Sequence, residues 1–407
     1  MKTDIYSRRN YDYQIPSSFI AQESASPRDN SRIRLVDRKK GDVLVLNNTR
    51  VIRARLIGKT ERDSEKGKMK NIIKTLLVFC MVFVSSLVLA QDHLDREHHS
   101  HAKHIYGPVG VMGGHPHKKG EWMFSYSYST MSMRGNRDGN NSISSAQVLN
   151  NFMVSPTKMI MQMHMFGLMY GINDKLTLMG MLPYSSISMD HLNRMGVRFT
   201  TTSEGISDIK LSGIYTLHQQ GNRILLLNAG ISFPTGSIDK RDTTPVGANQ
   251  KLPYPMQLGS GTHDFLPGIT YTDQQGNWSW GGQLKASVRF DKNDNDYRLG
   301  NEGNLIIWGA RKLTNYASLS LRLDAKKWGD IHGADPELNP MMVPTSRTDL
   351  RGGERLDLLF GIDLTAAEGK LEGNKLAVEF GFPIYQYLDG PQLELDYRLT
   401  IGWQLLF

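Results

Sequence analysis

The sequence predicts an all-β protein, an antiparallel up-and-down transmembrane barrel of about 12 strands. Three observations predict this fold. Apolar and polar residues alternate in a series of short segments, the connections between these segments are alternately short and long, and the last segment is rich in aromatic residues. The barrel is expected over residues 121–407, after an internal signal-peptide-like helix and a small N-terminal fragment.

The alternation is clearest between Trp278 and Phe290, where Trp280 lies on one parity and Gln283 and Lys285 lie on the other. A period of two places the two sets on opposite faces of a strand. The same pattern marks twelve candidate strands: 121–133, 158–170, 175–184, 206–218, 223–234, 263–272, 278–290, 302–311, 316–326, 355–364, 374–384 and 392–407.

The lengths of the connections distinguish a barrel from a soluble sandwich, which also alternates. The short connections are 171–174, 219–222, 273–277 and 312–315. The long, polar ones are 134–157, 185–205, 235–262 and 327–354. Short turns at one rim and long loops at the other, with an even number of strands, are typical of bacterial outer-membrane barrels.

The C-terminal segment supports the same fold. Leu395, Tyr397, Trp403 and Phe407 share one parity, and aromatic residues are typical of the lipid-facing girdles of such barrels. An aromatic C-terminal strand is also the feature that the outer-membrane assembly machinery recognises. Twelve strands would enclose a lumen wider than that of an eight-stranded barrel and narrower than that of a porin.

Residues 69–90 have the layout of a secretory signal peptide, with Lys70 and Lys74, an apolar run and a cleavage site expected after Ala90. A transmembrane helix is the alternative, since the run is close to the roughly 20 residues that such a helix needs. The only cysteine, Cys80, lies in this stretch. Because signal peptides are N-terminal, Met69 is predicted to be the true start of translation.

The positive charge of the chain is confined to its first part. Residues 1–70 contain 17 Lys+Arg and 9 Asp+Glu, and the remaining residues contain 31 of each. The high pI therefore does not indicate nucleic-acid binding by the larger part. Between the apolar stretch and the first strand, residues 91–120 form a histidine-rich tail.

Residues 11–58 carry the motifs IAQ (20–22), RDNSR (28–32) and LVLNNTRVIRARL (44–56). They resemble the N-terminus of S-adenosylmethionine:tRNA ribosyltransferase-isomerase, an enzyme of queuosine biosynthesis. The resemblance is expected to end near Lys59, and residues 42–56 read as two strands joined at Asn47-Asn48. We interpret residues 1–68 as a truncated fragment, from a fusion or a gene-model artefact, without enzymatic activity.

The predicted barrel also resembles a known family. The residues that carry this resemblance are YGINDKLTLMGMLPY (170–184), SDIKLSGIY (207–215), FPTGSID (233–239), LPYPMQLGSGT (252–262) and the closing segment 380–407. They resemble the transporter-like outer-membrane proteins grouped as the MetA pathway of phenol degradation family. The resemblance implies a barrel with a transport role.

Charged residues on the polar parity of the strands are predicted to line the lumen. They are Asp208, Lys210, Lys285, Arg289, Arg322, Asp324, Glu394, Asp396 and Arg398. One interpretation is a polar pathway without a strong ion preference, because both signs are present. The other is a set of ion pairs across strands that stabilise the wall.

Methionine and histidine residues form the candidate metal site: His98, His99, His101, His104, His115, His117, Met163, His164, Met165, Met179 and Met181. Thioether and imidazole select Cu(I), and imidazole also suits zinc. In the alternative interpretation the methionines are apolar filler or face lipid, and the histidines belong to a solvated tail. Apart from this copper or zinc, no cofactor is expected.

The sequence thus predicts an exported outer-membrane barrel that acts as a passive transporter or channel for small solutes, with a link to soft-metal handling. No catalytic residues are predicted, because the barrel part has no motif for nucleophilic or metal-dependent hydrolysis. The expected partners are outer-membrane lipid, the barrel-assembly machinery and a small-molecule or metal substrate, and no nucleic acid. A closed structural barrel without transport is the alternative.

Overall fold

The computed structural model describes residues 42–47, 50–55, 107–366 and 371–407. The chain divides into two compact units, Met1–Glu97 and His98–Phe407. Within the described ranges, no helix has both the length and the apolar character needed to cross a membrane. The predicted signal peptide, its cleavage site and residues 91–106 of the predicted tail lie outside these ranges.

The described part of the first unit is a β-hairpin. Strands β1 (Asp42–Asn47) and β2 (Arg50–Arg55) pair antiparallel, with Asp42 opposite Arg55 and Asn47 opposite Arg50. The two strands predicted over residues 42–56 are therefore confirmed. Residues 1–41 of the predicted fragment lie outside the described ranges.

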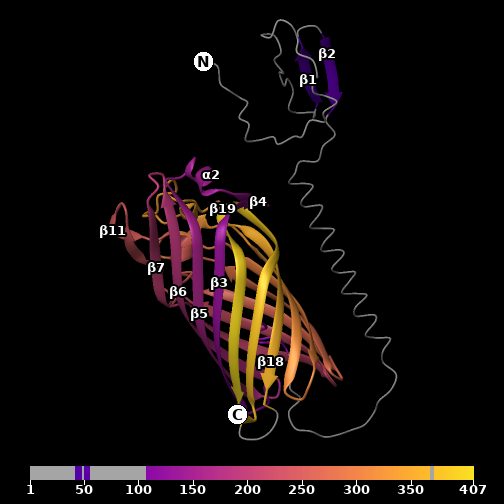
Figure 1. Ribbon diagram of the computed structural model, residues 1–407. Coiled ribbons are helices and arrows are strands. Elements are labelled where there is room, and N and C mark those ends of the chain that lie inside the picture. The colour runs from indigo at the N-terminus through magenta and orange to yellow at the C-terminus, as the bar shows by residue number, and fades with distance from the viewer. Residues whose placement is uncertain (1–41, 48–49, 56–106, 367–370) are drawn as a thin grey trace. The chain divides into compact units, whose positions relative to one another are not determined.

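The second unit is an antiparallel barrel (Figure 1). Its wall is formed by eleven labelled strands in the described residues: β3 (Trp122–Gly139), β5 (Val154–Asn173), β6 (Leu176–Asn193), β8 (Ile209–Gln220), β9 (Arg223–Phe233), β12 (Asp264–Gln275), β13 (Trp278–Arg289), β15 (Glu302–Lys312), β16 (Ala317–Trp328), β18 (Gly353–Thr365) and β19 (Asn374–Leu406). Each strand pairs with the next in this order, and β19 pairs with β3 to close the ring.

Strand β19 reverses direction and occupies two positions in the wall. An odd number of straight strands cannot close a ring in which every pairing is antiparallel. The first part of β19 pairs with β18 and the later part pairs with β3. The amide of Leu406 donates to the Gly373 carbonyl (3.0 Å), and the Gln386 side chain bonds both backbone groups of Leu395. The described wall therefore has twelve positions, which confirms the predicted fold.

Alternation along each strand separates a lipid-facing side from a lumenal side. On β18, Phe360, Ile362 and Leu364 are 50%, 52% and 49% exposed, whereas Leu359 and Asp363 are 1% and 2% exposed. Large exposed apolar side chains recur in this way around the barrel. The exposed face is therefore the apolar one, as expected of a barrel wall in lipid.

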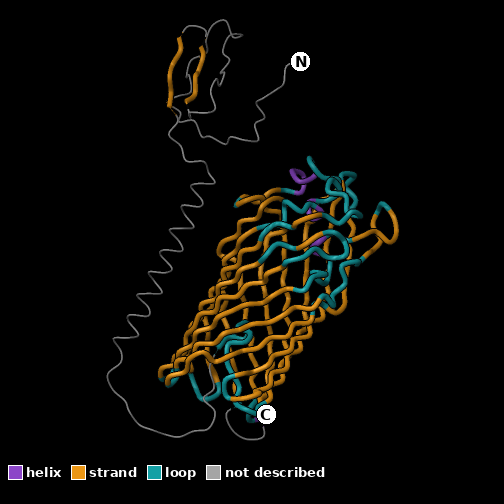
Figure 2. The backbone as a smooth tube through the Cα atoms, turned by 180° about the vertical axis from the view of Figure 1, so that it is seen from behind, coloured by secondary structure: helices purple, strands orange, loops and turns teal. Residues whose placement is uncertain are grey.

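The remaining elements lie at the end of the barrel opposite the C-terminus (Figures 1 and 2). They are β4 (Asn141–Ile143), α2 (Ser145–Leu149), β7 (Arg198–Ile206), β10 (Arg241–Thr244), β11 (Gly247–Lys251), η4 (Tyr254–Met256), β14 (Tyr297–Arg298), β17 (His332–Gly333) and η5 (Pro344–Ser346). Strand β6 continues nine residues beyond its predicted end at Tyr184, because residues 184–192 pair with β7 after the pairing with β8 has ended.

Candidate functional site

One side of the lumen carries a chain of paired charges. Arg322 on β16 bonds Glu379 on β19 through two guanidinium nitrogens, one of them at 3.0 Å, and also bonds Asp324 at 2.9 Å. Arg398, on the other arm of β19, bonds Asp324 at 3.1 Å and Asp357 on β18 at 3.4 Å. Arg322 and Glu379 are each 1% exposed, and the side chain of Arg398 is 19% exposed. The network therefore joins a fully buried ion pair to a partly exposed cation across three strands.

The other predicted lumenal charges have different environments. Asp208 follows β7 and accepts hydrogen bonds from the Gly236 amide (3.0 Å) and from the amide and hydroxyl of Ser260 (2.8 and 2.9 Å). Arg289 pairs with Asp264 at 3.0 Å. Lys210 and Lys285 have lumenal positions on β8 and β13 and make no ion pair within residues 107–366 and 371–407.

Glu394 and Asp396 do not line the lumen as predicted. Between Leu395 and Tyr397 the strand advances two residues while β3 advances one, which is a β-bulge that inverts the alternation. Leu395 is only 3% exposed and Asp396 is exposed. Leu395 therefore does not belong to the lipid-facing set that was predicted to run from it to Phe407. Glu394 forms an ion pair with Arg137 on β3 instead.

Another part of the lumenal wall, formed by β3, β5 and β6, is rich in methionine. Met159, Met161, Met163, Met165 and Met169 occupy the less exposed parity of β5, beside Phe166 and Leu168, which are 42% and 45% exposed on the other parity. The alternative that these methionines face lipid is therefore wrong. Met159, Met161 and Met169 form parts of two packed clusters, one toward each end of the barrel.

The two clusters have different partners. The upper cluster packs Met159 and Met189 against Leu252, Met256 and Leu258 of the loop that follows β9. The lower cluster contains Met123, Met169 and Met179, with Met181 packed against it. In both places methionine fills space between the wall and a segment inside the barrel, which suits its flexible side chain.

His164 lies away from the neighbouring methionines Met163 and Met165. Its Nδ1 is 2.8 Å from the Tyr126 hydroxyl, and its ring contacts Tyr128 and Tyr184. Tyr184 is 38% exposed, so this aromatic group lies on the outer face. The structure therefore does not bring His164 together with Met163 and Met165 in one site.

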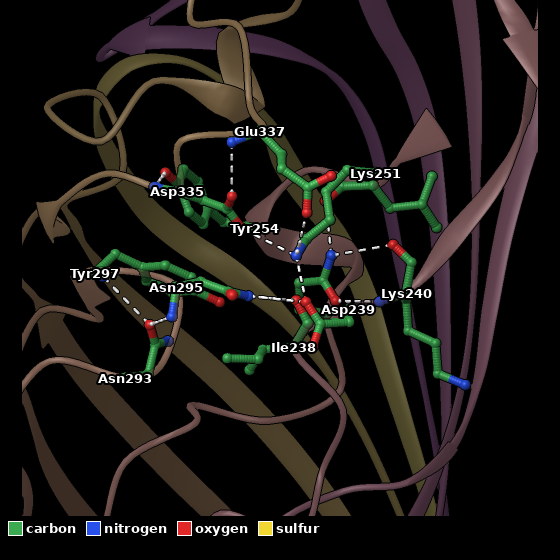
Figure 3. A network of polar contacts seen from close by, with 12 residues as sticks. Ile238, Asp239, Lys240, Lys251, Tyr254, Asn293, Asn295, Tyr297, Asp335 and Glu337 are labelled. Carbon is green, nitrogen blue, oxygen red and sulfur yellow. Dashed lines mark hydrogen bonds and ion pairs between the residues drawn. The ribbon is translucent and has the colours of Figure 1, made fainter. Parts of the chain in front are cut away.

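The loops of residues 234–263, 291–301 and 329–352 lie at the end opposite the C-terminus and form a partial closure, here called the loop cap. Figure 3 shows the polar network within it. Its centre is Lys251, 3% exposed at the side chain, whose Nζ lies 2.5 Å from Asp239, 3.1 Å from Asp335 and 3.8 Å from Glu337. The Tyr254 hydroxyl accepts a hydrogen bond from the Asp335 amide at 3.0 Å.

The ionisation of the loop cap follows from these contacts. Burial acts to lower the pKa of Lys251, but its bonds to Asp239 and Asp335 outweigh burial and raise it. The hydrogen bond from Lys251 holds the pKa of Asp239 below its ordinary value. Burial raises the pKa of Tyr254. Lys251 and Asp239 are therefore both charged at neutral pH, as an ion pair requires.

A second closure lies at the other end, where residues 107–121, here called the plug, lie within the ring of strands. The plug touches lumenal side chains all round the wall. Its carbonyls at Gly107, Met112 and Gly113 accept hydrogen bonds from Lys375 (2.8 Å), Gln283 (3.0 Å) and Asn228 (3.0 Å). These donors belong to β19, β13 and β9, so only a segment inside the barrel can reach them all.

The root of the plug is fixed at the turn between β5 and β6. Thr177 Oγ1 accepts a hydrogen bond from the His117 amide at 2.8 Å. The Gly120 amide donates to the Gly171 carbonyl (2.8 Å), and the Gly171 amide donates to the Glu121 carbonyl (3.0 Å). Residues 107–120 are therefore a lumenal element, and the expectation of a solvated histidine tail is wrong for this part.

Burial in the plug determines the ionisation of its two histidines. Burial, followed by the charges of His117 and Lys375, lowers the pKa of His115 to about 3. Burial also lowers the pKa of His117, against the opposing effect of Glu121. Both rings are neutral at physiological pH.

Sequence reasoning missed several residues that complete the lumen. They are Asn228, Asp264, Gln283, Arg355, Asp357, Asp363, Lys375 and Glu379. The alternation that identified Arg322 also holds on β18 and the first arm of β19, and would have found Asp357 and Glu379. The plug has only a weak signal, its many glycines between Gly107 and Gly120.

These features define the class of protein, a β-barrel of the outer-membrane type with a lumen closed by internal segments. Its fold matches the crystal structure of the COG4313 outer membrane channel from Pseudomonas putida F1 with a TM-score of 0.53 and 16% identity, over 74% of this chain and 100% of that chain. Residues 157–334 match the family model described as MetA-pathway of phenol degradation. The resemblance expected from the barrel sequence is thus confirmed.

The N-terminal part matches a different family. Residues 8–98 match the model described as Queuosine biosynthesis protein, a range that extends beyond the predicted end near Lys59. S-adenosylmethionine:tRNA ribosyltransferase-isomerases from Thermosynechococcus vestitus and a Sulfurihydrogenibium strain are 47% and 41% identical over 70 and 72 residues, each 14% of this chain. The chain spans 20% and 21% of these enzymes. This resemblance is confirmed as well.

Proposed function

We propose that the barrel acts in the outer membrane as a passive channel for small solutes, and that it carries no catalytic activity. The observation that carries the proposal is the two-faced wall, apolar outside and lined inside by Arg322, Asp324, Glu379 and neutral polar groups. A purely structural barrel has no need of a polar, charged interior, whereas selective pores are commonly lined in this way.

Both signs of charge are present along this lumen, and most of them are paired, so we expect weak ion selectivity. The plug and the loop cap each fill part of the lumen, so we expect both segments to restrict the width of the pathway. The barrel-assembly machinery and outer-membrane lipid are the expected partners for insertion, and export is expected to depend on residues 69–90.

Single-channel recording of the refolded full chain in planar bilayers tests the channel proposal. The expected result is discrete conductance steps, with larger or more frequent openings in Gly110→Leu, which disturbs the plug. Gly303→Ala is the control, because a Cβ there has open space around it. Folded protein that conducts in neither form would support the structural barrel instead.

Copper handling is the second candidate function. It is favoured by the methionines that β3, β5 and β6 direct to one side of the lumen, since thioethers select Cu(I). Proteoliposomes loaded with a Cu(I) chelator dye are expected to take up Cu(I) faster with the wild-type barrel than with a Met163→Leu, Met165→Leu variant. Equal rates would exclude a role for these thioethers.

The N-terminal segment is proposed to have no transferase activity, because the chain spans only a fifth of the enzymes that it matches. Incubation of the full chain with S-adenosylmethionine and substrate tRNA tests this point. Formation of a queuosine precursor would contradict it.

A further inference from the structure

We propose that His115 and His117 of the plug, together with the thioether of Met179 on β6, form a Cu(I) site at the junction between plug and wall. The inference deepens the copper-handling proposal and rests on it for its biological meaning. It does not require the barrel to conduct.

His117 has the arrangement of a metal ligand on both ring nitrogens. Its Nδ1 lies 3.7 Å from Oε2 of Glu121, and its Nε2 is buried without a hydrogen-bond partner among the described residues. The whole residue is 5% exposed. A histidine that ligates a metal through one nitrogen commonly faces a carboxylate with the other. A buried nitrogen without a partner is otherwise costly.

His115 lies beside it. The two ring centroids are 5.0 Å apart, with planes at 77°, and the His115 side chain has no hydrogen bond within residues 107–366 and 371–407. Pro116 separates the two histidines and fixes its own φ, so the backbone between them is restrained. Two imidazoles thus lie next to each other on a restrained segment.

Met179 on β6 supplies a thioether side chain that lies close to the plug at Gly113. A Cβ placed on Gly113 would lie 3.6 Å from its Cε. The His117 amide bonds Thr177, which precedes Met179 by two residues and faces the same way on β6. Met179 is 6% exposed and lies opposite Met169 on β5. The histidine segment therefore runs along the part of the wall that carries these sulfurs.

The donor types decide which metal fits. Within the described part of the chain, no three His, Cys, Asp or Glu side chains converge as a metal site. A structural zinc site usually takes four such ligands. Two imidazoles and a thioether suit Cu(I), which accepts soft ligands.

The test measures Cu(I) affinity in detergent by competition with bicinchoninate under ascorbate. It uses the full chain with His93, His98, His99, His101 and His104 replaced by alanine, so that these residues cannot bind the ion. The parent is expected to hold one Cu(I). His117→Gln, which keeps a polar side chain of similar size, is expected to weaken binding about 100-fold or more, and Glu121→Gln about 10-fold.

Three further variants locate the site. His115→Gln is expected to weaken binding as His117→Gln does, Met179→Leu to weaken it about 10-fold, and His218→Gln, exposed on β8, to leave it unchanged. Heat-modifiable migration on gels checks that each barrel is folded. A folded parent that holds no Cu(I), or a His117→Gln variant with parental affinity, would overturn the site.

Parental Cu(I) affinity in Met179→Leu would overturn the three-ligand site, because Met179 would then not be a ligand. Two further outcomes separate this inference from the other proposals. Conductance without Cu(I) binding would overturn the site and leave the channel, whereas Cu(I) binding without conductance would support the site and overturn the channel.

Discussion

The two closures of the lumen are built on different principles. The loop cap is held by ion pairs around the side chain of Lys251. The plug is held through its main-chain carbonyls, which accept single hydrogen bonds from side chains such as those of Gln283 and Asn228. A charge network depends on a few specific side chains. A main chain held by many separate hydrogen bonds depends instead on small residues that allow the backbone to approach the wall.

The largest effect is expected from Lys251→Met in the loop cap. It leaves Asp335, 2% exposed at the side chain, buried without its cation, and the loss of one partner of a buried pair costs about 3 kcal/mol or more. Hydrogen exchange of the amides in residues 251–256 should accelerate about 100-fold. Arg347→Met, in a more exposed pair with Asp349, is the control. Unchanged protection would mean that the charges do not hold the cap.

The plug is expected to lose most stability when one of its small residues is replaced by a larger one. A Cβ on Gly110 would collide with the guanidinium of Arg322 and lie 2.9 Å from Oε1 of Glu379. Because this pair is buried and bonded in two places, overpacking by Gly110→Leu should cost about 1–3 kcal/mol. Protease cleavage within residues 107–121 should become faster, while the loop cap keeps its protection. Cleavage at the wild-type rate would contradict this account.

Single donors to the plug should matter less. Asn228→Ala and Gln283→Ala each remove one hydrogen bond to a plug carbonyl, and each should weaken the plug by about 1 kcal/mol. Both side chains also bond Thr270, so the double variant is expected to depart from the sum of the single effects in hydrogen exchange of residues 112–114. Gln219→Ala, at an exposed turn, serves as the control. If either single variant increased exchange in the plug as much as Lys251→Met increases exchange in the loop cap, the two closures would not differ in how they are held.

The two closures should also differ in the pH at which acid increases their amide exchange. The pKa of Asp239 is depressed, so its stabilisation is present above the ordinary value of 3.8 and is lost as pH falls through the lower folded pKa. The raised pKa of Lys251 places the alkaline limit above 10.5. Exchange in residues 112–114 should rise as pH falls below ~6.5, because burial depresses the pKa of His115 and His117 and both gain protons when the plug opens. Exchange in the loop cap should rise only below pH ~4. Equal changes at both ends would contradict the comparison.

The sequence by itself determined the barrel, because lipid outside and a polar lumen inside impose an alternation that each strand carries locally. Alternation placed Arg322, Asp324 and Arg398 correctly with respect to their neighbours on the strand. It failed at Glu394 and Asp396, where a bulge of one residue inverts the parity. Bulges depend on pairing with another strand and leave little trace in the local pattern.

Only the tertiary structure decided what fills the lumen. Residues 107–121 look like a polar tail in sequence, and they become a plug through hydrogen-bond partners far away along the chain. Asp174 accepts from Lys119 at a separation of 55 positions, and Lys375 donates to Gly107 at a separation of 268 positions. The loop cap likewise joins Lys251 to Asp335. Such contacts have no periodicity, because they arise when the closed wall brings distant segments into one enclosed space.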